Sequence, residues 1–314
     1  MNDPSDLPTL FAVIVRDGRL PAGLWPADAD PERYGLVLKD GHVQPPQPLE
    51  PLVGESILAA ADPATASWVR RLDVYPAIDS TNAQLMQRAT GGSIDGHVSL
   101  AEVQLQGRGR RGRTWSSPFG GSIAVSMGIA LDRDPAALGG SSLVVGLAVL
   151  DALEQLGAQD AGLKWPNDLL LGDAKLGGIL IELAAAARSS ALVVGIGINV
   201  ALGARVRSEL DRPVADLSAF GPPSRNLLAG RVLSSVVAFL RAFEADGFSA
   251  FRDAFCARHR YHGRACRVLL GERTASGRVV GVSNDGGLLL ETQGRVEEFH
   301  GGEVSLREDA AGGP

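Results

Sequence analysis

The stretch LKWPNDLLLGDAKLGGILIEL, residues 163–183, holds two apolar runs around a central Gly-Asp pair. This pattern predicts a β-hairpin that turns at the Gly-Asp pair. With a two-residue turn, Leu170 faces Lys175, and Asp168 lies on the same face of the sheet one diagonal step away, at about 7–8 Å. A three-residue turn would put the acid and the amine on opposite faces. On one face, the two charges form either a plain surface pair or a pair that brackets a phosphate and its metal.

Further strand-like runs flank this hairpin and alternate with helical patterns. The runs cover residues 97–104, 122–131, 162–172, 175–184 and 191–200, after a strand that is expected to end near Ile78. Apolar residues recur at helical spacing over 135–157 and 226–245, and a shorter helix is expected to begin at Ser80 or Thr81, which are both good N-caps. Residues 66–262 are therefore predicted to form an α/β domain in which helices cover a sheet.

A basic loop, QGRGRRGRTW at residues 106–115, lies between two of these strands. Its glycines allow positive φ and let backbone N–H groups face an anion, and its arginines offer planar forks for phosphate or carboxylate. An RGG-like RNA-binding segment and a solvated basic turn are the alternatives. The loop occurs once and runs directly into Trp115, whose ring could stack on a base, so the sequence favours a small-anion site.

The strand VVGIGINV, residues 193–200, places Gly195 and Gly197 on one face. Small residues at this spacing leave a slot along the sheet, although close packing of a helix would need them equally. Ser80, Thr81 and Gln104 stand at the ends of other predicted elements. A slot lined by these groups suits a flat, uncharged, polar head group.

Composition excludes several classes of protein. The net charge is −6 and hydrophobic residues make up 45% of the chain, which is typical of a folded globular protein and not of one that coats DNA. The two cysteines, Cys256 and Cys266, have no metal-like spacing and are expected to be reduced thiols. No secretory signal begins the sequence and no apolar run reaches about 18 residues, so we expect a cytoplasmic protein without a membrane span.

The two ends differ from the middle. Residues 1–65 contain short strand-like runs at 10–18 and 34–43, Pro-rich connectors and an acidic charge balance, with no recognisable helix-turn-helix. Residues 263–308 hold five short strand-like runs separated by Gly-rich turns, which predict a small SH3-like β-barrel. Residues 309–314 are expected to be a disordered tail.

Taken in order, the segments DSTN, AEVQLQGRGRRGRTWSSPFGGSIAVSM, KWPNDLLLGDAKLGGILIE, GIGINV and GGEVSLR resemble the biotin protein ligase family, also called biotin–[acetyl-CoA-carboxylase] ligase. The resemblance covers about residues 45–307. It implies a fold of the α/β (α+β) class, with a class-II-synthetase-like mixed-sheet catalytic domain and a C-terminal SH3-like β-barrel. It also implies two half-reactions. Biotin and MgATP give biotinyl-5'-AMP and pyrophosphate, and a lysine of a biotin carboxyl carrier protein then displaces AMP.

The resemblance assigns roles to residues of this chain. The implied catalytic residues are Arg110, Lys175 and Asp168, and Asp168 would orient the carrier lysine or hold Mg²⁺. Biotin would be bound by Ser80, Thr81, Asn82, Gln104, Gly107, Arg108, Arg110, Lys175, Gly178 and Gly195. The nucleotide would be bound by Arg110, Arg111, Trp115, Lys164, Asn167, Asn199, Glu303 and Arg307, with Trp115 on the adenine side. ATP and Mg²⁺ enter as co-substrate and activator, and no tightly bound cofactor is expected.

The chain departs from the family at its N-terminus. Many bacterial relatives carry an N-terminal winged helix-turn-helix and act as repressors, but residues 1–45 are too short, acidic and Pro-rich to match it. We therefore expect a ligase without repressor function, and DNA binding is not expected. The alternatives are a bifunctional ligase and biotin-operon repressor, a lipoate or octanoate ligase of the same fold, and a catalytically idle carrier-binding protein. A homodimer through the edge of the catalytic sheet is compatible with the sequence.

Overall fold

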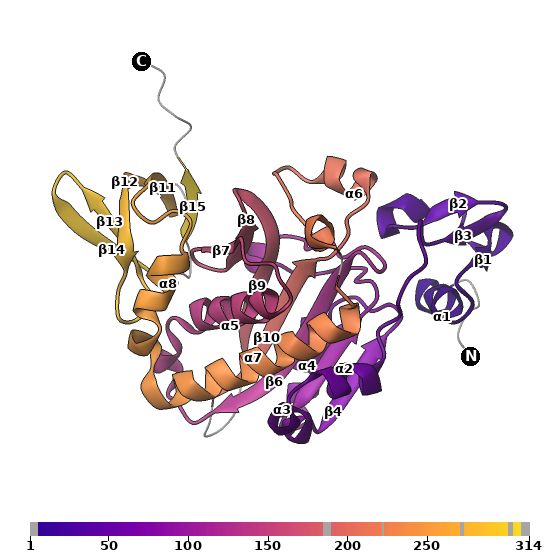
Figure 1. Ribbon diagram of the computed structural model, residues 1–314, viewed down its shortest axis with the longest axis horizontal. Coiled ribbons are helices and arrows are strands. Elements are labelled where there is room, and N and C mark those ends of the chain that lie inside the picture. Colours follow the sequence, from indigo (N-terminus) through magenta and orange to yellow (C-terminus); the bar gives the residue numbers. More distant parts are fainter. Residues whose placement is uncertain (1–5, 185–189, 222, 271–272, 301–303, 309–314) are drawn as a thin grey trace, which may run out of the picture.

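The computed structural model describes residues 6–184, 190–221, 223–270, 273–300 and 304–308. A seven-stranded sheet forms the middle of the molecule, with a small N-terminal unit at one end and a five-stranded C-terminal sheet at the other (Figure 1). This arrangement places the predicted ligand-binding segments in the middle part.

The central sheet has the strand order β4-β5-β6-β10-β9-β8-β7. Its strands are β4 (Arg71–Tyr75), β5 (His97–Ala101), β6 (Ser122–Leu131), β7 (Ala161–Lys164), β8 (Asp168–Leu171), β9 (Ala174–Ala184) and β10 (Ser190–Asn199). Only β4 and β5 run parallel to each other, and the remaining neighbours are antiparallel. The mixed sheet expected for the fold class is confirmed.

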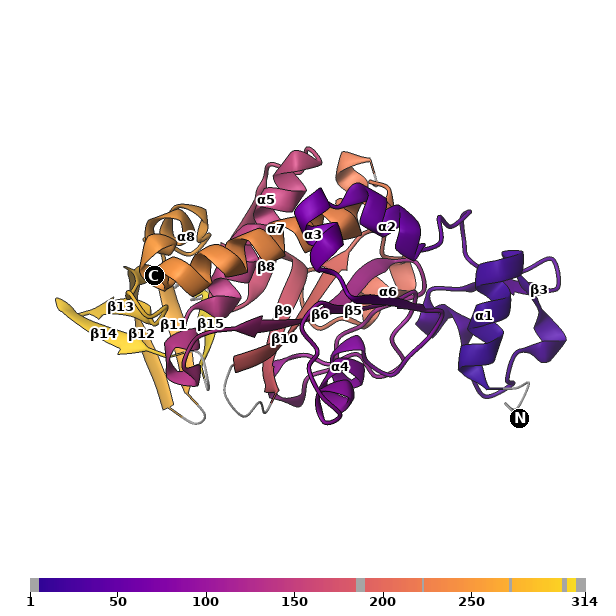
Figure 2. The same ribbon diagram turned by 90° about the horizontal axis from the view of Figure 1, so that it is seen from below.

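Helices cover the two faces of this sheet unequally. Helices α5 (Ser141–Gln155) and α7 (Arg225–Asp246) lie on one face, with α2 (Gly54–Ala60) and α3 (Pro63–Trp68) beside α7 (Figure 2). Helix α4 (Thr81–Ala89) lies on the other face and begins at Ser80, whose side chain accepts the Ala83 N–H as expected for an N-cap. Because α4 covers only part of its face, the rest of that face is available for a ligand.

Two of the covering helices satisfy the length and composition expected of membrane spans. These helical segments are Pro135–Gln155 and Arg225–Asp246. The sequence did not predict a membrane span in either, because neither contains an uninterrupted apolar run of about 18 residues. Their apolar side chains pack against the sheet and against each other, and 61% of an 18-residue apolar stretch in each segment is buried inside the protein. Burial in a core accounts for this composition without a membrane.

The opening stretch folds as the two-residue turn predicts. Leu171 pairs with Ala174 and Leu170 pairs with Lys175 around the Gly-Asp turn, and a bulge then brings Asp168 opposite Gly178. The run 162–172 is not one strand, however. A cis Trp165–Pro166 bond separates β7 from β8, because proline cannot donate to a ladder and fixes the backbone in a turn.

The N-terminal unit corrects one expectation. Residues 10–18 were expected to form a strand, but they belong to helix α1 (Leu7–Asp17), which ends on the left-handed Gly18. The run Phe-Ala-Val-Ile-Val is rich in β-branched residues and so looks like a strand, yet its buried residues, Leu10, Phe11 and Ile14, are spaced for one helix face. Tertiary packing overrides the local propensity.

The rest of the unit is small. A three-stranded sheet in the order β1-β3-β2 contains β1 (Leu20–Pro21), β2 (Val37–Lys39) and β3 (His42–Gln44), with 3₁₀ turns η1 (Ala22–Leu24) and η2 (Pro31–Tyr34) between β1 and β2. The expected Asp-Gly turn joins β2 to β3. Phe11 packs on Trp25, Tyr34 and Phe119, so an aromatic cluster attaches the unit to the catalytic domain.

The expected domain boundary at residue 65 would cut through α3 and would separate α2 from α7, on which it packs. Leu52 and Ile57 lie in the main hydrophobic core, whereas Leu10, Phe11 and Val43 form a second one. We therefore propose that the catalytic domain begins near residue 50.

The C-terminal part holds all five predicted strands. They form an antiparallel sheet in the order β14-β13-β12-β11-β15, built from β11 (Ala265–Leu270), β12 (Arg273–Val282), β13 (Leu288–Thr292), β14 (Arg295–Phe299) and β15 (Val304–Glu308). The Trp165 indole N–H donates to the Gly286 carbonyl over 3.0 Å, which fixes this sheet to the catalytic domain.

Other short helical elements connect the strands and the long helices. They are η4 (Pro135–Leu138), α6 (Ala204–Glu209), η5 (Leu217–Phe220), η6 (Phe248–Ala250) and α8 (Arg252–Arg258).

A buried ion pair fastens the connector that enters the catalytic domain. Arg225, at the start of α7, donates to Glu102 over 2.7 Å, and the side chains are only 5% and 1% exposed. Glu102 also accepts the Leu52 N–H, and Arg225 donates to the Glu50 carbonyl. These contacts tie residues 50–52 to the end of β5 and to α7.

We predict that Arg225→Ala destabilises the protein by about 3–5 kcal/mol, because the Glu102 carboxylate stays buried without its counter-charge. The free energy of unfolding in urea measures this. Arg278→Ala, which removes a largely exposed ion pair with Glu291, is the control and should cost no more than about 1 kcal/mol. Equal losses in the two variants would show that the buried pair has no special role.

Candidate active site

A cavity of about 820 Å³ opens on the face of the sheet that α4 leaves uncovered. Its walls come from the start of α4, the basic loop, strands β6 to β10 and the segment around α6. Most of the residues named by the resemblance line this one cavity, namely Ser80, Thr81, Asn82, Gln104, Arg108, Arg110, Arg111, Trp115, Lys164, Asn167, Asp168, Lys175, Gly178, Gly195 and Asn199.

The basic loop forms a short hairpin over the cavity, here called the lid and defined as residues 107–115. The Gly109 N–H donates to the Arg113 carbonyl over 2.7 Å, and the Trp115 N–H donates to the Gly107 carbonyl over 2.9 Å. The tip is a 3₁₀ turn, η3 (Arg110–Gly112), in which Arg111 has φ 60°. Gly107 does not line the cavity; a side chain there would clash with the Trp115 carbonyl, so its role is to let the lid close.

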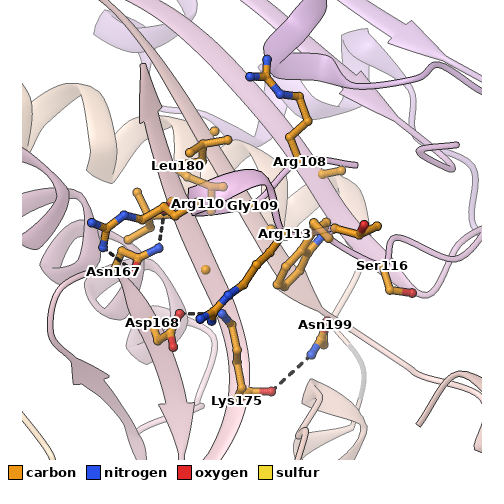
Figure 3. Close-up of a pocket in the computed structure, with 18 of the residues that line it drawn as sticks. Arg108, Gly109, Arg110, Arg113, Ser116, Asn167, Asp168, Lys175, Leu180 and Asn199 are labelled. Carbon is orange, nitrogen blue, oxygen red and sulfur yellow. Dashed lines mark hydrogen bonds and ion pairs between the residues drawn. The ribbon is translucent and has the colours of Figure 1, made fainter. Parts of the chain in front are cut away.

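Cationic side chains meet at one end of the cavity. The Lys175 ammonium lies 2.5 Å from the Asp168 carboxylate and 5.8 Å from the centre of the Trp115 ring. Arg110 reaches across from the lid and donates to the Asn167 side-chain oxygen over 3.2 Å (Figure 3). Burial lowers the pKa of Arg110 from its ordinary value, the neighbouring Arg111 lowers it further, and Asp168 opposes this. A desolvated guanidinium of this kind is well placed to bind an anion.

Asn167 and Asn199 hold the backbone around this cationic end. The Asn167 amide donates to the Ile179 carbonyl over 2.7 Å, and the Asn199 amide donates to the carbonyls of Ala215 and Lys175 (Figure 3). The Lys164 ammonium lies 5.3 Å from the centre of the Tyr261 ring, which partly covers it. These residues therefore shape the cationic end, and a direct contact with nucleotide stays a prediction.

Two residues predicted from the C-terminal part cannot be placed here. Glu303 lies outside the described residues. Arg307 belongs to β15, where it pairs with Arg267 across the ladder, but its side chain is not described.

Uncharged hydrogen-bonding groups gather at the other end of the cavity. Gln104 accepts the backbone N–H of Thr81 over 2.9 Å, and the Thr81 hydroxyl lies 3.2 Å from the same oxygen. The Ser126 hydroxyl lies 2.7 Å from the Thr81 hydroxyl and 2.5 Å from the Asn82 side-chain oxygen. Sequence reasoning missed Ser126, although its place in the middle of β6 makes it a polar residue in an otherwise apolar run.

The slot expected along β10 exists, but protein side chains fill it. A side chain at Gly195 would clash with the Asn82 amide, and one at Gly197 would clash with the Trp115 indole. The two glycines are thus needed for close packing of these groups and not as an open space for a head group.

The segment around α6 forms a further wall that sequence reasoning missed. Its apolar residues Leu202, Val206, Leu210 and Val214 line the cavity. Asp216 holds the segment in place by accepting the Leu202 N–H over 2.6 Å and by pairing with Arg207. Burial opposes ionisation of Asp216, but these hydrogen bonds and the Arg207 charge keep its pKa below the usual range.

The described residues do not build a metal centre of three or more acidic, histidine or cysteine side chains. Asp168 is the acidic group nearest the cationic end, and Lys175 is already its partner. Mg²⁺ is often bound through one carboxylate together with substrate phosphates. An Asp168 contact with Mg²⁺ brought by ATP therefore stays a prediction.

Comparisons with known proteins agree with this geometry. The profile of the Biotin/lipoate A/B protein ligase family matches residues 74–199, and the Biotin protein ligase C terminal domain matches residues 261–307. The bifunctional ligase/repressor BirA of Escherichia coli is 37% identical over 264 residues, which are 83% of this chain and 80% of that protein. The biotin–[acetyl-CoA-carboxylase] ligase of Mycobacterium tuberculosis is 36% identical, covering 77% of this chain and 90% of that one.

A solved structure gives the same result for the fold. Biotin protein ligase from Aquifex aeolicus, in complex with biotin and ATP, superposes with a TM-score of 0.66 and 31% identity, over 76% of this chain and 100% of that chain. The fold and the relatives define the class, which is that of the biotin and lipoate protein ligases. The chain belongs to the biotin protein ligase family.

We predict that Gly197→Ala forces the Trp115 ring off β10. The overpacked position should cost about 1–3 kcal/mol of stability and shift tryptophan emission to longer wavelength as the ring becomes more exposed. Gly203→Ala is the matched control, because a side chain there meets nothing within 4 Å. Unchanged emission and stability in Gly197→Ala would contradict the packing described for Trp115.

Proposed function

We propose that this chain activates biotin with ATP to form biotinyl-5'-AMP and transfers the biotinyl group to a lysine of a biotin carboxyl carrier protein. The observation that carries the proposal is the cavity itself, in which an uncharged hydrogen-bonding end is continuous with a cationic end beneath the lid. The ureido ring of biotin suits the first end, and its carboxylate and the ATP phosphates suit the second. The relatives described above carry this activity in their names.

The first half-reaction needs fixed positive charge. A carboxylate oxygen of biotin attacks the α-phosphorus of ATP, the bond to the bridging oxygen breaks, and pyrophosphate leaves. Two anions must approach each other, so Lys175 and Arg110 stabilise the negative charge that builds up on the phosphoryl oxygens. A Mg²⁺ ion bound to ATP would supply further positive charge at the phosphates, and Asp168 would be its candidate contact. Asp168 keeps the Lys175 ammonium pointing into the cavity.

The second half-reaction consumes the mixed anhydride. The neutral amine of the carrier lysine attacks the acyl carbon, AMP leaves with the electron pair of the broken C–O bond, and the amine loses its proton. Asp168 is the candidate for orienting that amine. Water would hydrolyse the anhydride, and the lid is placed to exclude it.

Biotin-dependent exchange of labelled pyrophosphate into ATP tests the proposal. The exchange needs only the first half-reaction, so it reports on the cavity without any carrier protein. It should appear with biotin and be absent without it. A chain that binds carrier proteins but lacks catalysis gives no exchange, and that result would refute the proposed function.

Lipoate is the rival substrate within the family. The hydrogen-bonding groups of Thr81, Asn82, Gln104 and Ser126 favour a ring that carries N–H and C=O groups over a dithiolane ring, which carries neither. In a competition assay biotin should be used and lipoate should not. Equal use of the two acids would mean that these groups do not face the head group.

We also propose that the N-terminal unit does not make this chain a repressor. Within residues 6–49 the structure has one α-helix, α1, and two 3₁₀ turns, so that region offers no recognition helix to a major groove. Helix α1 is moreover packed on the catalytic domain through Phe11. A gel-shift assay on the biotin-operon operator, with biotin and ATP present, should show no complex. A specific shift would establish the bifunctional alternative.

We predict that Arg110→Gly releases biotinyl-5'-AMP and labels bystander lysines, because the lid loses its buried anion-binding group. A biotin blot of a protein mixture should show many labelled bands in place of one. Arg19→Gly, outside the cavity, is a control that should keep the single band. Unchanged selectivity in Arg110→Gly would count against the role of Arg110 in retaining the adenylate.

A further inference from the structure

A chain of polar side chains joins the lid to the uncharged end of the cavity, and Glu182 of β9 is its link to the lid. One Glu182 oxygen lies 3.0 Å from the Arg108 guanidinium of the lid. The other accepts a hydrogen bond of 2.9 Å from the Asn82 amide. One carboxylate therefore contacts both the lid and the floor of the uncharged end, here defined as Thr81, Asn82, Gln104 and Ser126.

Glu182 also determines which way the Asn82 amide faces. The Asn82 NH₂ group donates to Glu182 and to the Leu180 carbonyl, which both lack a proton to give. The amide oxygen must then face Ser126, whose hydroxyl lies 2.5 Å away. Ser126 gives its single proton to that oxygen, so the Thr81 hydroxyl, 2.7 Å away, donates to Ser126, and Gln104 accepts the Thr81 backbone N–H. The contact with Glu182 therefore determines which groups of the floor donate hydrogen bonds and which accept them.

The two contacts of Glu182 differ in exposure. The side chain of Arg108 is 49% exposed and that of Glu182 is 21% exposed, whereas Asn82 and Ser126 are buried. A half-exposed ion pair is weak and can break when the lid opens. The buried hydrogen bonds to Asn82 cost more to break and remain in place.

We propose that Glu182 is a positioning residue that latches the lid through Arg108 and at the same time sets the Asn82 amide beside the head group. Closing of the lid is thereby coupled to an ordered floor under the head group. The head-group part rests on the proposed function, since it takes the ureido ring of biotin as the group that this floor receives. The latch itself depends only on the contacts of the protein.

Glu182→Gln separates the two contacts. Glutamine can still accept the Asn82 hydrogen bond through its oxygen, but it no longer pairs with Arg108. Release of biotinyl-5'-AMP should become about two- to fivefold faster, which is the size expected for a half-exposed ion pair, while the biotin KM stays near that of the wild type. Glu182→Ala removes both contacts, so the biotin KM should also rise, by about tenfold.

The lid provides a readout that needs no substrate, because its arginines are trypsin sites. In the full chain without ligand, Glu182→Gln should be cut within residues 108–113 about two- to fivefold faster than the wild type, as mass spectrometry of the fragments would show. Arg108→Ala should speed release of the adenylate to the same extent. The double variant should be no faster than either single one.

Glu291→Gln is the control, because it breaks an ion pair of the same kind, with Arg278, between β12 and β13. It should leave release, KM and lid cleavage unchanged. Wild-type rates of release and cleavage in Glu182→Gln, or additive effects in the double variant, would overturn the latch. If the wild type shows no biotin-dependent pyrophosphate exchange, the proposed function fails and the head-group part with it, whereas the cleavage comparison still decides on the latch.

Discussion

The ion pair between Asp168 and Lys175 is the contact around which the site is arranged. It spans the β8–β9 hairpin, where the two-residue turn puts Leu170 opposite Lys175 and therefore Asp168, two residues earlier, on the face of Lys175. Both side chains are about one-fifth exposed, at 19% and 18%, which leaves the ammonium accessible while a carboxylate keeps it in place. The lid, Asn167 and Trp115 all approach this point from other elements.

Close packing on the sheet explains why the two ends of the cavity form one site. Glycines on β9 and β10 let Trp115 and Asn82 lie directly on the strands. Trp115 lies on β10 near Lys175, and Asn82 belongs to the polar chain that reaches the lid through Glu182. The geometry is thus consistent with a substrate that carries a polar ring at one end and a carboxylate at the other.

Much of this could be predicted from the sequence, because the decisive patterns are local. The Gly-Asp turn predicts the register of β8 and β9, and alternation and helical spacing predict most of the central sheet and its two long helices. The helix α1 could not be recognised in this way, since Phe-Ala-Val-Ile-Val has strand-like propensity and only packing on Phe119 decides its conformation. The contents of the Gly195–Gly197 slot likewise depend on residues far away in the sequence. Glu182 shares the face of Gly178 and Leu180 by simple alternation, but its partner Arg108 becomes visible only when the lid is placed.

Rapid-quench measurement of biotinyl-5'-AMP formation by Lys175→Met tests the central claim most directly. Methionine keeps an unbranched apolar stem and removes the terminal ammonium group with its charge and its N–H donors. If the ammonium held by Asp168 stabilises the transition state of adenylation, the rate at saturating biotin and ATP should fall by about 10²–10³-fold. Adenylate formation at the wild-type rate would contradict the account.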